Sequence, residues 1–402
     1  MRFTFHAAPP QNEWFNDPNG LVFIDGRYRL FTQYSASAPD YKEIGWSRLS
    51  SDDLLHWEWD GCVISPDESG LAYSGSVSAE RGNLTVYLTR HNPLEQRQFR
   101  LSSVDSGKSW HQDIEQLGPH GRNVRDPFVF IHADSGNRMM LLAEPCDWHD
   151  WKQQRPSHLS VWCETAMNWE RVGTIGPWSP RGIMWEVPVL VDFGTRHVLI
   201  ISIVDRSHGT SQCSVRYWTG HFDGKCFLAD DPTSGRLLDH GPDFYAVCAN
   251  TIFGWPTADR VIVGWASSWA TARLVAWPDH VQGGPISLPR KLSLYEHHLR
   301  QSPIDQAERL ATLYVWTPGD CFEFTIHGDG TNFVLRIDET GTLEAKRSGS
   351  ISMNWACHEP CFLTNLTTIK VFNDCGLLEF FFLTEGKTLT VFLPHSQNLT
   401  QA

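Results

Sequence analysis

The sequence predicts an all-β protein, a five-bladed β-propeller followed by a C-terminal β-sandwich. Three observations lead to this fold class. Strand starts and tryptophans recur at a regular interval along the chain, the apolar runs between them are short, and the recurrence stops near residue 290. Gly, Asp, Asn and Ser separate the runs, and no sustained helical periodicity is present. Short runs bounded by such turn residues indicate strands.

The recurrence follows two series of positions. Each unit opens on a polar residue beside an apolar run, and these openings are Asp17, Ser74, Asp126, Glu186 and Asp243, spaced 57, 52, 60 and 57 apart. An aromatic residue then follows a polar turn in four units: Trp57, Trp110, Trp169 and Phe227, spaced 53, 59 and 58 apart. A repeat of this length is typical of a propeller blade.

About four short strands fit into each unit. In the first unit we expect them at Leu21–Ile24, Tyr28–Gln33, Ile44–Leu49 and Trp57–Trp59. Blades are arranged radially, so the first strand of each lines the central channel. Residues at the same phase of the repeat should therefore meet at one end of that channel, although they are far apart in the sequence.

The repeat ends after Leu288–Leu292, and a second domain follows. We predict the propeller over residues 1–296, a linker that can form a short helix over 297–313, and a β-sandwich over 314–402. The sandwich strands are expected at Cys321–Ile326, Asn332–Ile337, Thr368–Phe372, Leu377–Leu383 and Thr388–Leu393, with Gly/Asp/Asn turns between them. We assign no chemistry to this domain.

Composition narrows the possible partners. The net charge of −13 argues against nucleic acid and anionic membranes, which need a Lys/Arg surface. The 18 Trp and 22 Phe residues suit both β-structure and stacking on carbohydrate. No membrane-length apolar run and no signal core at Met1–His6 are present, so we expect a cytoplasmic protein unless a leader was removed. Cys357–Cys361 lacks a second ligand pair, so no metal site is predicted.

Three acidic residues share one local pattern. Asp17, Asp126 and Glu186 each stand within two positions of a proline and directly before an apolar strand. A single acid in this pattern is typical of a turn. Three acids at the same position of the repeat should instead lie close together in space. Carboxylates crowded in one place separate their pKa values, so that one is ionised while another carries a proton. Retaining cleavage of a glycosidic bond needs such a pair, about 5–5.5 Å apart.

The neighbours of these acids suggest their roles. Asn16 and Arg125 can keep Asp17 and Asp126 charged, whereas the apolar neighbours of Glu186 favour its protonated form. We therefore predict Asp17 as the nucleophile and Glu186 as the acid/base. Asp126 would hold sugar hydroxyls and offset the charge of the oxocarbenium-like transition state.

Several motifs, in this order, resemble glycoside hydrolase family 32, the β-fructofuranosidases (invertases, levanases, inulinases and fructan exohydrolases). The three strongest are Trp14–Gly20, Arg125–Pro127 and Trp185–Pro188. Further segments agree with the family, namely Phe31–Tyr34, Gly45–Trp46, Tyr73–Ser76, Asp239–Ala246, Gly264–Trp265, Leu288–Arg290 and Val371–Asp374.

The resemblance covers nearly the whole chain. It implies a five-bladed propeller with a β-sandwich and retaining hydrolysis of terminal β-D-fructofuranosides in sucrose, fructo-oligosaccharides or fructans, without a metal or organic cofactor. By motif position it implies the same roles for the three acids. The residues that it implies for fructose binding are Asn16, Gln33, Trp46, Ser74, Arg125, Asp243 and Trp265.

Other readings of the sequence stay open. The same scaffold can serve a fructosyltransferase, in which a sugar instead of water accepts the fructosyl group. A five-bladed inverting glycosidase acting on arabinan or xylan also uses three acids, and an inactive sugar-binding propeller would need none of them. The family usually has Cys where this chain has Val187, and we expect Trp148 and Trp151 to shape the subsite for the leaving group.

Overall fold

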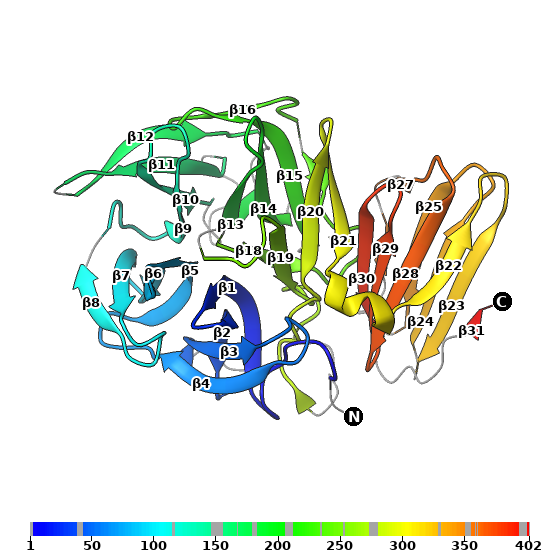
Figure 1. The fold of residues 1–402 in the computed structure, drawn as a ribbon, viewed down its shortest axis with the longest axis horizontal. Coiled ribbons are helices and arrows are strands. Elements are labelled where there is room, and N and C mark those ends of the chain that lie inside the picture. The colour runs from blue at the N-terminus through cyan, green and yellow to red at the C-terminus, as the bar shows by residue number, and fades with distance from the viewer. Residues whose placement is uncertain are drawn as a thin grey trace.

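The computed structural model describes residues 3–37, 43–114, 117–145, 156–166, 168–178, 183–205, 212–233, 235–251, 254–272, 280–328, 331–349, 355–357, 359, 361–393 and 400–401. Its architecture is all-β, as predicted, and the strands of this part of the chain form seven antiparallel sheets. Five of these sheets precede residue 304 and two follow it (Figure 1). Of the described residues, no helix is long and apolar enough to cross a bilayer.

Each of the first five sheets contains four strands that are consecutive in the chain, and the fourth sheet has one strand more. The first sheet has β1 (Trp14–Ile24), β2 (Arg27–Ser35), β3 (Gly45–Ser51) and β4 (Glu58–Ile64). The second has β5 (Leu71–Glu80), β6 (Asn83–His91), β7 (Gln96–Ser103) and β8 (His111–Ile114). The third has β9 (Arg125–Ile131), β10 (Arg138–Glu144), β11 (His158–Glu164) and β12 (Trp169–Ile175).

The next two sheets repeat this order. The fourth has β13 (Ile183–Asp192), β14 (His197–Asp205), β15 (Gln212–Phe222) and β16 (Phe227–Ala229), with β17 (Arg236–Leu237) added beside β15. The fifth has β18 (Tyr245–Ala249), β19 (Arg260–Trp265), β20 (Arg290–Tyr295) and β21 (His298–Pro303). The up-and-down order within each sheet fits a propeller.

The first strands of these sheets surround a common axis. β1 contacts β5 and β18, β9 contacts β5 and β13, and β13 also contacts β18, so the five strands close a ring. Figure 1 looks along this axis, with the sheets fanning outward from it. Apolar side chains of neighbouring sheets pack between them, for example Leu141 and Val161 of the third sheet with Leu199 and Trp218 of the fourth. Burial on both faces explains why inner strands such as β14 read as continuous apolar runs.

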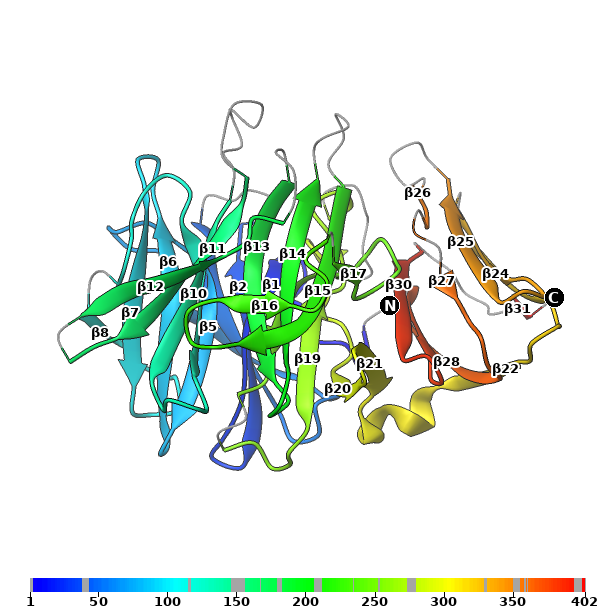
Figure 2. The same ribbon diagram turned by 90° about the horizontal axis from the view of Figure 1, so that it is seen from above.

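Two further sheets form the second domain. One has β22 (Thr312–Trp316), β28 (Thr367–Asp374), β29 (Leu377–Phe382) and β30 (Lys387–Phe392). The other has β26 (Trp355–Ala356), β25 (Thr342–Ser348), β24 (Thr331–Ile337), β23 (Phe322–Gly328) and β31 (Thr400–Gln401), with β27 (Cys361–Phe362) beside β25. Alternate residues of β24 are buried, and an apolar core lies between the two sheets. Figure 2 shows this domain lying beside the ring of sheets.

The segment between the domains differs from the predicted linker. Residues 298–303 form β21, which pairs with β20 of the fifth sheet, so the ring region extends to Pro303. A short 3-10 helix, η3 (Asp305–Leu310), then precedes β22. The predicted helix exists, but the linker is shorter than expected, because residues 298–303 complete the hydrogen-bond ladder of the fifth sheet.

A buried ionic network joins the second domain to the ring. Arg290 of β20 donates to Asp239 at 2.8 Å and to Glu379 of β29 at 2.7 Å. His6 lies between Glu379 and Asp374, at 2.9 Å from each. Burial opposes a charge on His6, but its hydrogen bonds to Asp374 and Glu379 outweigh burial and raise its pKa to about 9. The protonated ring therefore bridges two carboxylates and fixes the N-terminal segment to the second domain.

Candidate active site

Each of the five ring strands has an irregular register at the same phase of the repeat. The shifts lie between Phe15 and Pro18, between Ala72 and Gly75, and between Glu186 and Val189, with equivalents in β9 and β18. Non-glycine residues at three of these places have left-handed backbones: Asp126 with φ 62°, Val187 with φ 47° and Ala246 with φ 49°. Bulges redirect side chains and are frequent beside active sites, and the repeated strain marks this end of the channel as functional.

Asp17 is held by uncharged donors. The Ser74 hydroxyl donates to Asp17 Oδ2 at 2.5 Å, and the Asn16 amide donates to Oδ1 at 3.0 Å. The same Asn16 amide nitrogen donates to Gln33 Oε1, while Asn16 Oδ1 accepts from the Trp14 indole at 2.9 Å. These bonds fix the orientation of the Asp17 carboxylate relative to β1, β2 and β5.

Asp126 is held by backbone and hydroxyl groups. Its Oδ2 accepts a hydrogen bond from the backbone N–H of Val187 at 3.0 Å. Its own N–H donates to Thr89 Oγ1 at 3.0 Å. Asp126 of β9 is thus attached to β13 at the residue that follows Glu186, so the bulges of two neighbouring sheets bring these two acids together.

Glu186 lies in a polar clamp. Arg125 donates to Glu186 Oε1 from Nη2 at 2.8 Å and from Nε at 3.2 Å, and the Tyr245 hydroxyl donates to Oε2 at 2.7 Å. The sequence-based expectation of apolar surroundings is therefore wrong. The neighbours in sequence, Trp185 and Val187, are buried in apolar clusters, but the bulge turns the carboxylate between them toward residues of β9 and β18.

The three acids interact electrostatically. Burial is the largest influence on Asp17 and, together with the charge of Glu186, raises its pKa to about 6 despite the bonds from Ser74 and Asn16. Burial also raises the pKa of Asp126 to about 7; Arg125 opposes this shift, and Glu186 and Asp17 add to it. Asn16 and Arg125 were expected to keep these carboxylates charged; they do lower the pKa values, but desolvation outweighs them. Asp17 and Asp126 therefore exchange protons near neutral pH.

The residues that were expected to bind fructose fall into two groups. Asn16, Gln33, Ser74 and Arg125 contact the acids or each other. Trp46 and Trp265 are fully buried, and their indole N–H groups donate to the carbonyl oxygens of Tyr73 and Gly283 at 3.0 and 3.1 Å. In this structure the two tryptophans support the walls of the site from behind.

Asp243 differs most from its expected role. Its Oδ1 accepts from Thr271 at 3.0 Å, and its Oδ2 accepts from Arg347 at 2.5 Å and from the Phe392 N–H at 2.9 Å. Arg347 and Phe392 belong to the second domain, and Asp243 is fully buried. The structure corrects the sequence-based role: both carboxylate oxygens have protein partners, and the buried side chain joins the two domains.

Three contacts in the site were not foreseen. Tyr245, two residues after Asp243, is the residue of β18 that reaches Glu186. Its phase in the repeat was a usable signal, but only the structure shows that Tyr245, and not Asp243, bonds to one of the acids. Thr89 and Gln96 lie on β6 and β7 and bond to Asp126 and Arg125; nothing in their sequence context indicates this. Trp148 and Trp151 lie outside the described residues.

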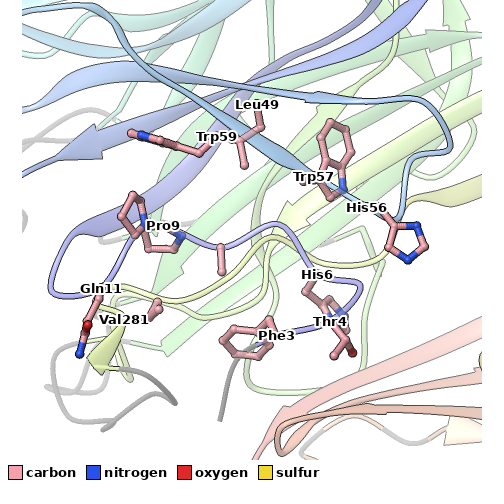
Figure 3. A pocket seen from close by; sticks show the side chains of 12 residues that line it. Phe3, Thr4, His6, Pro9, Gln11, Leu49, His56, Trp57, Trp59 and Val281 are labelled. Carbon is pink, nitrogen blue, oxygen red and sulfur yellow. The ribbon is translucent and has the colours of Figure 1, made fainter.

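One cavity beside this region has Asp126 in its wall, and a second cavity is lined by none of the three acids. A channel cavity of about 240 Å³ follows the ring strands, with Asp126 and Val187 in its wall. A cavity of about 560 Å³ lies between the N-terminal segment and the β3–β4 region (Figure 3). No group of three His, Cys, Asp or Glu side chains in the described part of the chain is arranged to hold a metal ion.

Comparison with known proteins gives enzymes as relatives. The extracellular exo-inulinase of Aspergillus ficuum is 25% identical over 407 residues, covering 86% of this chain and 73% of that protein. The sucrose-6-phosphate hydrolase of Zymomonas mobilis is 28% identical over 331 residues, covering 76% and 62%. The solved fructofuranosidase of Schwanniomyces occidentalis, complexed with fructose, superimposes with a TM-score of 0.81 at 18% identity, covering 100% of this chain and 93% of that one.

These relatives bear on location and on family. The expected cytoplasmic location is wrong by this comparison, since the first relative is named as an extracellular enzyme. That expectation rested on the lack of an apolar signal core at Met1–His6, which describes this segment and not where the protein acts.

The model of the Glycosyl hydrolases family 32 N-terminal domain matches residues 6–303, most of the chain. The chain therefore belongs to glycosyl hydrolase family 32 and is a glycoside hydrolase.

Proposed function

We propose that this protein is a retaining β-fructofuranosidase that releases terminal fructose from sucrose, fructo-oligosaccharides or fructans. The names of its relatives, an exo-inulinase, a sucrose-6-phosphate hydrolase and a fructofuranosidase complexed with fructose, support the substrate class. The mechanism rests on one observation, that the two acids accept hydrogen bonds from different kinds of donor. Asp17 accepts from neutral donors, whereas Glu186 accepts from Arg125 and Tyr245. Two carboxylates with distinct partners suit two distinct roles.

In the first step Asp17 attacks the anomeric carbon of the fructofuranosyl unit. The glycosidic C–O bond breaks, and Glu186 donates its proton to the departing oxygen, leaving a covalent fructosyl-enzyme. The reaction needs Asp17 ionised and one proton on Glu186. Burial raises the pKa values of Asp17 and Asp126 to about 6 and 7, so these two carboxyls exchange protons in this range.

In the second step water enters and Glu186, now a carboxylate, removes its proton. The water oxygen bonds to the anomeric carbon, the ester bond to Asp17 breaks, and β-fructose leaves with the original configuration. In both steps Asp126 would offset the positive charge of the transition state. The Val187 N–H fixes the position of the Asp126 carboxylate. This position therefore depends on the same bulge of β13 that orients Glu186.

The domain assignment belongs to the same proposal. We interpret the five ring sheets as the blades of a five-bladed propeller, ending near Pro303, and the two C-terminal sheets as a β-sandwich. The closed ring of first strands and the apolar layer between the last two sheets support this interpretation. In this architecture the acids lie at one end of the channel because each is at the same phase of its blade.

The test is release of free fructose from sucrose, kestose, inulin and levan by the wild type, Asp17→Asn and Glu186→Gln. We expect release by the wild type and a loss of at least about 10³-fold in both variants. The fructose first detected by NMR should be the β anomer. A first-formed α anomer would contradict retention, and undiminished release by Asp17→Asn would contradict the assigned nucleophile. Predominant transfer to sucrose instead of water would identify a fructosyltransferase.

A further inference from the structure

The cavity of about 560 Å³ beside the first sheet has no part in the proposed chemistry. Its walls come from the N-terminal segment between Phe3 and Gln11, from Leu49 and His56–Trp59, and from Val281. In Figure 3, Trp57 and Trp59 lie along one wall, and Pro9 and Phe3 lie along the opposite one. None of the three acids lines it, and its volume is within the range of small-molecule sites.

The lining of this cavity is suited to an uncharged ligand. No Lys, Arg, Asp or Glu side chain belongs to it. His6 borders it, but both ring nitrogens of His6 are occupied by Asp374 and Glu379. His56, which also lines the cavity, pairs with Asp53 at 2.6 Å. The cavity therefore offers no unpaired charge, and Gln11 is exposed at its rim. A phosphate or a carboxylate would find no counter-charge here, and the net charge of −13 further disfavours anions.

The two tryptophans are open to a ligand yet fixed in place. Trp59 remains 37% exposed, although its ring packs against Phe15 and Tyr34 with centroid distances of 5.7 and 5.0 Å. Trp57 is partly buried against the core cluster that contains Leu54 and Leu55. Among the described residues, neither indole N–H has a hydrogen-bond acceptor. Rings held this way lose little entropy on binding.

We propose that this cavity is a second carbohydrate-binding site, which holds a segment of fructan chain away from the catalytic acids. The C–H faces of sugar rings would pack on Trp57 and Trp59, and sugar hydroxyls would accept from the indole N–H groups and pair with Gln11. The wall is anchored from the second domain, since the backbone N–H of Thr4 donates to Asp374 at 2.9 Å. The choice of fructan among saccharides, and any effect on turnover, rest on the proposed function.

Affinity electrophoresis of the full chain in gels containing inulin or levan tests the site. The inactive Asp17→Asn protein serves as the parent, so that the gel polymer is not consumed. We expect the parent to be retarded, and Trp57→Ala and Trp59→Ala to weaken its retention by about tenfold each, a change of about 1.4 kcal/mol. Tyr295→Ala, at an aromatic side chain that is 56% exposed elsewhere, is the matched control and should leave retention unchanged.

The same substitutions in the active enzyme give a second readout. Trp57→Ala and Trp59→Ala should raise KM for inulin or levan severalfold and leave kcat/KM for sucrose unchanged, since sucrose is too short to reach both sites. Circular dichroism confirms that the variants are folded. Undiminished retention of a folded Trp57→Ala/Trp59→Ala double variant overturns the proposal, as does equal retention of the parent by xylan. Trp-dependent retention without fructose release by the wild type would keep this site and reject the fructosidase.

Discussion

Arg125 donates two hydrogen bonds to one oxygen of Glu186, from Nη2 at 2.8 Å and from Nε at 3.2 Å. The other oxygen accepts from the Tyr245 hydroxyl. Both oxygens of the proposed acid/base are thus engaged by residues of two other ring sheets. Such a carboxylate is oriented before substrate arrives, and pre-orientation of reacting groups is a major source of rate enhancement.

Tyr245→Phe should lower kcat by about tenfold to a hundredfold with little change in KM. The substitution removes one hydrogen bond to a charged group, which contributes roughly 1.5–3 kcal/mol, and leaves the ring that packs in the core. Steady-state kinetics with sucrose measures the effect. Tyr87→Phe, at a buried tyrosine of the second sheet, is the control. Equal kcat in Tyr245→Phe and wild type would show that the clamp has no catalytic role.

Ser74→Ala should move the acid limb of the pH–rate profile to higher pH, by up to about one unit. The Ser74 hydroxyl stabilises the ionised form of Asp17, whose pKa burial already raises to about 6. Without this bond the pKa rises further, so a smaller fraction of Asp17, the proposed nucleophile, is ionised at a given pH. Ser76→Ala removes a hydroxyl that bonds to the carbonyl of Pro127 and should leave the limb in place. Coincident limbs in Ser74→Ala and wild type would reject this account.

Asp126→Asn should abolish most activity and yet stabilise the fold above neutral pH. Burial raises the folded pKa of Asp126 to about 7, above the value near 3.9 expected when unfolded. The folded state therefore holds the proton more tightly, and wild-type stability falls as pH rises from about 4 to 7. The variant lacks this penalty. Its advantage in urea unfolding should reach up to roughly 3 kcal/mol at pH 8 and vanish near pH 4.

The control for that measurement is Asp231→Asn, at an exposed position. It should track the wild type at both pH values. A stability difference between Asp126→Asn and wild type that is the same at pH 4 and pH 8 would contradict the assigned cause, because a pH-independent difference cannot come from ionisation of Asp126.

Asp243→Asn should reduce stability and leave KM for sucrose nearly unchanged. The substitution weakens the partner of a buried arginine, Arg347, and breaking a buried ion pair typically costs about 3–5 kcal/mol. Urea unfolding and sucrose kinetics are both needed. Replacing the pair together, as Asp243→Asn with Arg347→Met, should recover much of the loss, since no unpaired charge remains. A several-fold rise in KM at unchanged stability would instead restore the sugar-binding role expected from the sequence.

The local pattern of the chain indicated most of the architecture. The regular period of the repeat located the first strand of each of the five ring sheets, since each must begin with a polar turn and continue into an apolar run buried on both faces. The expected strand Tyr28–Gln33 lies inside β2, and Thr388–Leu393 nearly coincides with β30. The segment over 298–303 was misassigned because its buried residues, Leu299, Gln301 and Pro303, do not form an apolar alternation.

The sequence and the tertiary structure determine different features of the site. The sequence by itself determined which acids exist and that they share a phase of the repeat, because turn residues and apolar runs along the chain define that phase. Only the tertiary structure decided which side chains meet. Tyr245, the first residue of β18, reaches Glu186, whereas Asp243, two residues earlier and outside the strand, reaches the second domain. That choice depends on packing between blades, which no local pattern encodes.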